Sequence, residues 1–218
     1  MLVRQLPLIA GIAPIAGVTG AYWLGVNSGV LPSCMPLIDG CTSISATGRN
    51  MPGSLLFRAV MLPQSVLLIV VWYLAARWMR NSAMAAKTAL TVVISGLFGA
   101  LALVLYVILL GNKTPLYEFM RRFGVYFYFL GTATAQLSLG LVLLTHAKRT
   151  AARTLKRLAT AMLWLCGLPF ALGILNFVLK AILVDADFVE NRIEWIAALL
   201  MQCYFVVLYL AWRSPFEI

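Results

Sequence analysis

Four basic side chains that could bind an anionic group lie near the ends of long apolar segments. Arg121 and Arg122 follow Glu118 at i+3 and i+4, so the three would be neighbours in the first turns of one helix. Arg58 lies near the start of an earlier apolar segment, and Lys180 lies near the end of a later one. Arginine binds phosphate through two parallel hydrogen bonds. These residues therefore predict a site for a lipid headgroup.

An acidic face could complete this site. Asp187, Glu190 and Glu194 repeat at i, i+3 and i+7, which places them on one face of a helix. We expect Arg58, at least one of the two adjacent arginines, and Glu194 to converge on one pocket, in which Glu194 holds the arginines in place. Two other interpretations stay open at this point. The charges could only pair with one another, or the acidic face could bind calcium.

The residues needed for common catalytic chemistry are scarce or far apart in the sequence. His146 is the only histidine, and a Ser–His–Asp arrangement requires contact among all three side chains. A zinc hydrolase needs three protein ligands around an open position, which one histidine and four scattered cysteines do not supply. We therefore expect no metal centre and no cofactor. These residues favour a protein that is not an enzyme, although they do not decide the question.

The elements that must position these residues are membrane-spanning helices. Of the 218 residues, 62% are hydrophobic and 11% are charged, whereas soluble domains have about 45–50% apolar and about 25% charged residues. The apolar residues form runs of about 20, the length that crosses a bilayer as a helix. The sequence thus predicts an all-α membrane protein, a six-transmembrane-helix bundle that forms one domain over residues 1–218. The spans fall at about 5–26, 54–78, 87–110, 118–145, 158–184 and 192–212.

The distribution of charge predicts that the N and C termini both lie inside. With that topology, ten of the 17 basic residues lie on the inner side and six of the seven acidic residues lie outside, in agreement with the positive-inside rule. Residues 27–53 then form one long outer loop between helices 1 and 2. The net charge of +10 reflects topology and nearby anionic lipids, and we expect no nucleic-acid partner. The protein would be integral to a bacterial inner membrane or, in a eukaryote, to an endomembrane or the plasma membrane.

The four cysteines fall into two pairs. Cys34 and Cys41 share the outer loop, in what would be an oxidising compartment, so we expect a disulfide between them. Cys166 and Cys203 lie inside spans, where a thiol behaves as a small apolar group.

Small and polar residues within the spans predict how the helices pack. The third span carries a face of small residues, formed by Ser95, Gly96, Gly99 and Ala100. Such a face allows two helices to approach closely. Gln136, in the fourth span, is expected to form a hydrogen bond to another helix.

The outer loop leads into the second span through a short motif. The residues concerned are Ile44, Ser45, Thr47, Gly48, Pro52, Phe57 and Arg58. This pattern resembles the signature region of the Frag/DRAM/Sfk family, which are six-helix membrane proteins that include autophagy modulators and the lipid-remodelling factor for GPI anchors. Glu194 and Trp195 are similar to the acidic–aromatic pair that opens the last helix of that family. The resemblance implies the same layout and the handling of lipids at the outer leaflet.

The chain departs from this family at positions that bear on catalysis. Ala46 stands where many relatives have aspartate, and Arg121-Arg122 stand where they have a histidine beside a small polar or acidic residue. Phe205 falls near the position of a further histidine in the remodelling branch. If the family transfers acyl groups through such histidines, this chain has lost the means. The resemblance thus implies lipid handling more than catalysis.

These observations predict a multi-pass membrane protein that binds or helps to remodel lipids at the outer leaflet, luminal or periplasmic. Membrane lipids would be its partners. The alternative is a non-catalytic accessory subunit of a larger membrane complex, with a membrane-protein partner. A small transporter comes third, because the sequence has no inverted repeat and no paired broken helices of the kind that transporters use.

Overall fold

The long apolar segments are helices in the computed structural model, which describes residues 2–112, 114–182 and 187–213. The six long helices are α1 (Leu6–Asn27), α4 (Gly53–Asn81), α5 (Ala86–Leu109), α6 (Pro115–Arg149), α7 (Arg153–Ile182) and α8 (Asp187–Trp212). Three short elements, η1 (Leu2–Gln5), α2 (Pro36–Asp39) and α3 (Ile44–Thr47), complete the set. All six long helices are long and apolar enough to cross a membrane, and the described residues contain no strand. The prediction of an all-α protein with six candidate spans is confirmed.

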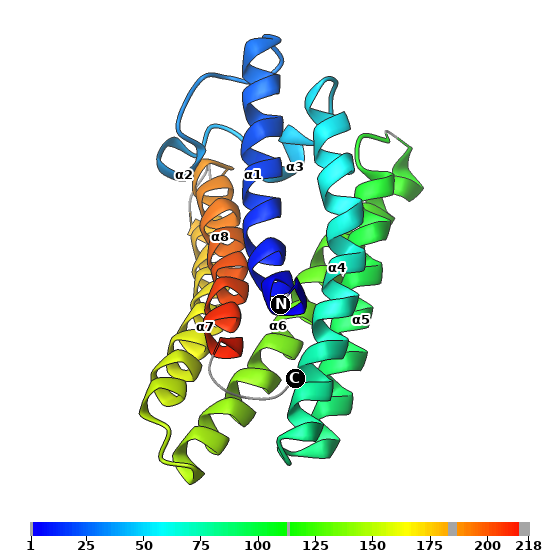
Figure 1. Cartoon of the computed structure of the whole chain (residues 1–218). Coiled ribbons are helices and arrows are strands. Elements are labelled where there is room, and N and C mark those ends of the chain that lie inside the picture. The colour runs from blue at the N-terminus through cyan, green and yellow to red at the C-terminus, as the bar shows by residue number, and fades with distance from the viewer. Residues whose placement is uncertain (1, 113, 183–186, 214–218) are drawn as a thin grey trace.

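The packing partners of the six helices form a closed ring. Its order is α1, α4, α5, α6, α7 and α8, and α8 packs back against α1. Consecutive helices run in opposite directions (Figure 1). We call the end of the bundle that carries residues 28–52 and the starts of α4, α6 and α8 the loop end. The opposite end, which carries the tight connections α4–α5 and α6–α7, is the turn end.

Small residues bring α5 and α6 into backbone contact. A Cβ atom added at Gly131 of α6 would lie 2.6 Å from the backbone nitrogen of Gly99 and 2.7 Å from the carbonyl oxygen of Ser95. Gly96 faces the ring of Trp72 on α4 so closely that a Cβ atom there would overlap it. The predicted small-residue face is therefore a true packing surface, on which α5 contacts both neighbours.

Two buried glutamines form hydrogen bonds between helices that are distant in sequence. Gln64 Nε2 donates to the carbonyl oxygen of Ala10 over 2.8 Å, which joins α4 to α1. Gln136 Nε2 donates to the carbonyl oxygen of Met201 over 3.0 Å, which joins α6 to α8 and confirms the expected inter-helix bond. Because a buried amide is costly without a partner, these bonds fix which helices meet.

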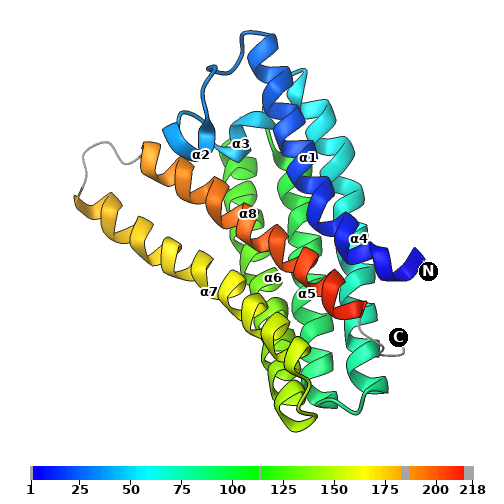
Figure 2. The ribbon, with the colours of Figure 1, turned by 60° about the vertical axis from the view of Figure 1, so that its left-hand side comes forward.

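Helix α7 is the least buried of the six. Its buried residues are Leu155, Ala159, Met162 and Cys166, which all lie in its turn-end half. From Gly167 to Ile182 the described chain of α7 has no buried residue. Pro169 lies at the start of this stretch, inside the helix. Toward the loop end, α7 diverges from α6 (Figure 2).

Candidate functional site

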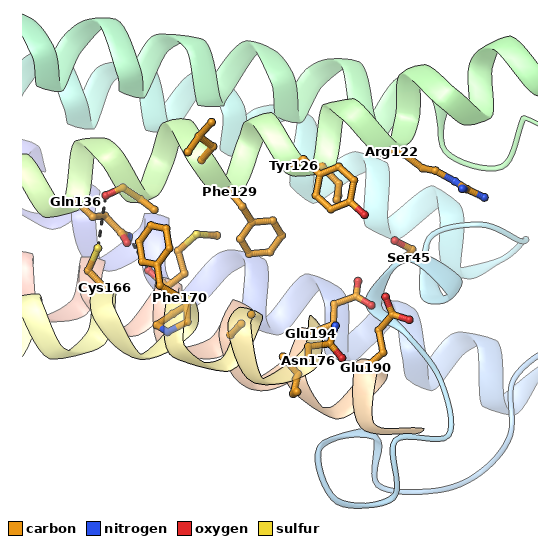
Figure 3. Close-up of a pocket in the computed structure, with 18 of the residues that line it drawn as sticks. Ser45, Arg122, Tyr126, Phe129, Gln136, Cys166, Phe170, Asn176, Glu190 and Glu194 are labelled. Carbon is orange, nitrogen blue, oxygen red and sulfur yellow. Dashed lines mark hydrogen bonds between the residues drawn. The ribbon is translucent and has the colours of Figure 1, made fainter. Parts of the chain in front are cut away.

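A cavity of about 650 Å³ lies between α6, α7 and α8, where α7 diverges. Its lining extends along α6 from Arg121 to Gln136. Fifteen residues of helix correspond to about 22 Å at 1.5 Å per residue, so the cavity is long and follows the helix axes. Ser45 of the short helix α3 contributes to its wall at the loop end (Figure 3). We call this space the α6–α8 cavity.

The lining of the α6–α8 cavity changes in polarity along its length. The loop end carries charged and amide side chains from all three helices: Arg121 and Arg122 from α6, Asn176 and Lys180 from α7, and Glu190 and Glu194 from α8. The middle is apolar and includes Phe129, Ala133, Phe170, Ile193 and Met201. The deepest polar group on α6 is Gln136, whose amide nitrogen is already bonded to α8. The cavity is therefore amphipathic, with one polar end and an apolar body.

Glu194 is held by the loop that precedes α4. Its carboxylate lies near the backbone N–H groups of Ile44 and Ser45, at the start of α3, which favour its negative charge. Ser43 caps the same short helix by accepting from the N–H of Ala46 over 3.1 Å. The hydroxyls of Ser45 and Tyr106 lie 2.9 Å apart. Glu194 therefore lines the cavity beside the short helix α3, which is joined to α5 through Ser45 and Tyr106.

The charges at the loop end are paired in part. Glu118 lies 3.0 Å from Arg122 and 3.7 Å from Arg121, and Lys180 pairs with Glu190 across α7 and α8. The two arginines differ in exposure, because the side chain of Arg121 is 15% exposed and that of Arg122 is 65% exposed. Figure 3 shows the Arg122 side chain extending toward the loop end of the cavity. Mutual pairing thus accounts for Arg122 and Lys180 better than for Arg121, whose distance to Glu118 is long.

The carboxylates form the opposite wall. Glu190 and Glu194 lie side by side on α8, and the Tyr126 and Ser45 side chains point toward them (Figure 3). Within the described residues, no group of three or more His, Cys, Asp or Glu side chains could hold a metal ion. Basic groups on α6 and α7 thus face acidic groups on α8 across one space.

Arg58 is the exception to the expected convergence. It does not line the α6–α8 cavity. Its Nη2 donates to the carbonyl oxygen of Leu110 over 2.7 Å, which satisfies a free carbonyl just after α5. Arg58 lies outside the cavity because its helix, α4, packs between α1 and α5, away from α7 and α8. The structure brings together Arg121, Arg122, Lys180 and Glu194, and it places Arg58 elsewhere.

The motif residues build the wall that carries Ser45. Thr47 is buried, and its hydroxyl donates to the carbonyl oxygen of Ile44 over 2.7 Å. Gly48 packs on the ring of Phe57, where an added Cβ atom would lie 2.6 Å from the ring. Phe57 is fully buried and meets Tyr106 edge to face, and Pro52 precedes α4. The motif therefore closes the loop end of the bundle.

A disulfide and several hydrogen bonds fix the rest of the loop on α8. Cys34 and Cys41 are bonded, as predicted. Asn191 Nδ2 donates to the carbonyl oxygen of Gly40 over 2.8 Å, and Trp195 Nε1 donates to that of Thr42 over 2.9 Å. Since Glu194 lies between these two donors in sequence, the loop and the carboxylate are positioned together.

Some lining residues gave no signal in the sequence. Phe129 and Phe170 have the same character as the lipid-facing residues around them, so nothing marked them as lining a cavity. Asn176 could have been found, because it is the only amide side chain in the apolar loop-end half of α7. Its Oδ1 is buried without a partner among the described atoms. An unpaired buried amide oxygen at this position points toward a ligand that donates a hydrogen bond.

Comparisons of the chain with protein-family models, with curated proteins and with solved structures found no match.

Proposed function

We propose that this protein binds a membrane lipid in the α6–α8 cavity, with the headgroup at the loop end and an acyl chain along the apolar body. The observation that carries the proposal is the change in polarity along one continuous cavity. A lipid has the same sequence of polar and apolar parts. The volume of about 650 Å³ lies within the range of about 300–1,000 Å³ that is typical of ligand sites.

The charged groups suit a zwitterionic or anionic headgroup. Arg121 is the best placed phosphate donor, because it is largely buried and only weakly paired with Glu118. The carboxylates of Glu190 and Glu194, together with the Asn176 amide oxygen, offer acceptors for an ammonium or hydroxyl group. Phosphatidylethanolamine carries both kinds of group, so it is a suitable probe.

We propose that a lipid enters the cavity from the side, between α6 and α7, where the two helices diverge (Figure 2). On this half of α7, the apolar side chains of Ile174 and Phe177 are 68% and 79% exposed. A Cβ atom added at Gly173, which lines the cavity, would meet nothing within 4 Å. A lipid that enters here would not have to leave the bilayer.

The resemblance to the Frag/DRAM/Sfk family supports the same proposal. The residues that carry it form the wall bearing Ser45 and hold Glu194, so they lie at the polar end of the cavity. The sequence has a single histidine, His146, which lines a different groove near the turn end. The proposal is therefore lipid binding, or assistance in lipid remodelling, without histidine-dependent catalysis. We further propose that the loop end faces the lumen or periplasm.

Two glycines of α7 offer a test with a matched control. Gly167 and Gly173 both have open space around an added Cβ atom, but only Gly173 lines the cavity. The Gly173→Phe variant would place a ring in the cavity, whereas Gly167→Phe would place one outside it. Native mass spectrometry of protein released from mild detergent should show a retained lipid in the wild type and in Gly167→Phe, and its loss in Gly173→Phe.

Thermal unfolding of each variant checks that the fold survives. Equal lipid retention in the two variants would refute the proposed site. A chain that retains no lipid but keeps a stoichiometric membrane-protein partner would be an accessory subunit instead.

A further inference from the structure

The turn end of the bundle is strongly basic. Eight Lys and Arg residues lie there, namely Arg77, Arg80, Lys87, Lys148, Arg149, Arg153, Lys156 and Arg157. The acidic residues of the described chain lie at the loop end, on α2, on α6 near its start and on α8 near its start. The positive charge of the turn end is therefore not compensated by any described carboxylate.

A second cavity opens into this basic region. It has a volume of about 310 Å³ and lies between the start of α5 and the last turns of α6. Arg149 and His146 line its turn-end part, and Thr88 and Ser138 contribute hydroxyl groups. The apolar side chains of Leu141 and Val142 lie between them along α6. We call this space the α5–α6 groove.

The start of α5 adds to the positive potential of the α5–α6 groove. Ala85, which lines the groove, occupies the N-cap position of α5 and provides no side-chain cap. The first turn of α5 contains no acidic residue. Free N–H groups and the helix dipole favour a negative charge at such a position. They supplement the positive charge of Arg149, which lines the groove.

We propose that the α5–α6 groove binds the phosphate group of an anionic ligand, with Arg149 as the principal donor. From Arg149 to Ser138 the lining of α6 spans eleven residues, or about 16 Å at 1.5 Å per residue. This length and its apolar middle fit an anionic phospholipid, whose chain would follow Leu141 and Val142. A soluble phosphate shares the same headgroup chemistry. The groove lies at the opposite end of the bundle from the polar end of the α6–α8 cavity, so the inference does not depend on the function proposed above.

The test compares two arginines of equal charge at the same end of the bundle. Arg149 lines the groove and Arg153, in the first turn of α7, does not. The protein in mild detergent is titrated with phosphatidylglycerol and, separately, with phosphatidylcholine, and bound lipid is counted by native mass spectrometry. We expect tighter binding of phosphatidylglycerol, a loss of about threefold to fivefold in Arg149→Gln, and a loss of less than about twofold in Arg153→Gln. Arg149 is exposed, and an exposed ionic contact corresponds to a change of up to about fivefold.

Two further measurements separate the groove from the other cavity and from simple charge attraction. The titration is repeated in the Gly173→Phe background, where the α6–α8 cavity is occupied, and the dependence on Arg149 should persist. Inorganic phosphate at millimolar concentration is then added as a competitor. Displacement of the lipid by phosphate would support the phosphate site and show that it also accepts a soluble phosphate. Equal losses in Arg149→Gln and Arg153→Gln, or no preference for phosphatidylglycerol, would overturn the proposal.

Discussion

Replacement of Arg121 by alanine should weaken lipid binding far more than replacement of the other arginines at the loop end. The apolar body of the α6–α8 cavity gives little net affinity, since an acyl chain leaves surroundings in the bilayer that are as apolar as the cavity. The contacts of the headgroup must then supply most of the free energy of binding. Among the arginines, Arg121 combines a position in the lining with a side chain that is only 15% exposed.

The expected magnitudes follow from exposure. A hydrogen bond to a charged group contributes about 1.5–3 kcal/mol where water is largely excluded, so Arg121→Ala should raise the dissociation constant about 10- to 150-fold. Arg122 is 65% exposed, and exposed ionic contacts contribute up to about 1 kcal/mol. Arg122→Ala should therefore cost no more than about fivefold. Arg58 binds the carbonyl oxygen of Leu110 outside the cavity, so Arg58→Ala should leave lipid affinity unchanged.

The assay is a titration of each purified variant with phosphatidylethanolamine, with bound lipid measured by native mass spectrometry. The thermal unfolding midpoint of each variant is measured in the same detergent, because a loss of fold would also release lipid. Arg58→Ala is the control for removal of a guanidinium from the same end of the bundle. The reasoning fails if Arg58→Ala weakens binding as much as Arg121→Ala, or if Arg122→Ala has the larger effect.

The loop on α8 gives two predictions about stability, each measured as the thermal unfolding midpoint in detergent. Gly40 has a φ of 64°, and an added Cβ atom would overlap the backbone carbonyl of Phe188. Gly40→Ala should therefore lower stability by more than the roughly 1–2 kcal/mol of a left-handed residue alone. Gly29 has a φ of 71° and open space around an added Cβ atom, so Gly29→Ala should lose only the roughly 1–2 kcal/mol of stability of a left-handed residue. Equal losses of stability in Gly40→Ala and Gly29→Ala would contradict the predicted overlap. Trp195→Phe removes one hydrogen bond to the loop and should cost about 0.5–1.5 kcal/mol, whereas Trp23→Phe, at a side chain that is 60% exposed, should change little. A Trp195→Phe variant as stable as the wild type would show that this bond does not hold the loop.

The helices could be predicted because each apolar run has the length of a span and carries its own boundary signals. The predicted spans agree with the helices to within about five residues at each end. The small-residue face of α5 was also predictable, because Gly96 and Gly99 are close neighbours on one helix and their spacing does not depend on the rest of the fold. The disulfide followed from two cysteines in one short loop.

The composition of the site was less predictable, because it depends on which helices are neighbours. The position of a residue along a span predicts which end of the bundle it lies at, and this reasoning correctly placed Arg58 at the loop end. It does not predict which helices are neighbours in the ring. Helix α5 separates α4, which carries Arg58, from α6, which carries Arg121. The i, i+3 spacing could relate Arg121 to Glu118, but no pattern within one helix could relate Lys180 to Glu190. The partners of Glu194 were hidden for the same reason, since they are backbone groups of a loop about 150 residues earlier.

The form of the α6–α8 cavity itself argues for a ligand that comes from the bilayer. In water, exposed apolar side chains that line the cavity, such as Leu130 and Phe170, would favour closure of α7 onto α6, because closure would remove apolar surface from the solvent. In a membrane, lipid chains contact these side chains as well as another helix would, so this driving force is lost. Gly173, which lines the cavity, offers no side chain to fill the gap, and the described half of α7 beyond Cys166 has no buried residue. The lipid binding proposed above would fill this open cavity, and the charged groups at its loop end would then select the headgroup.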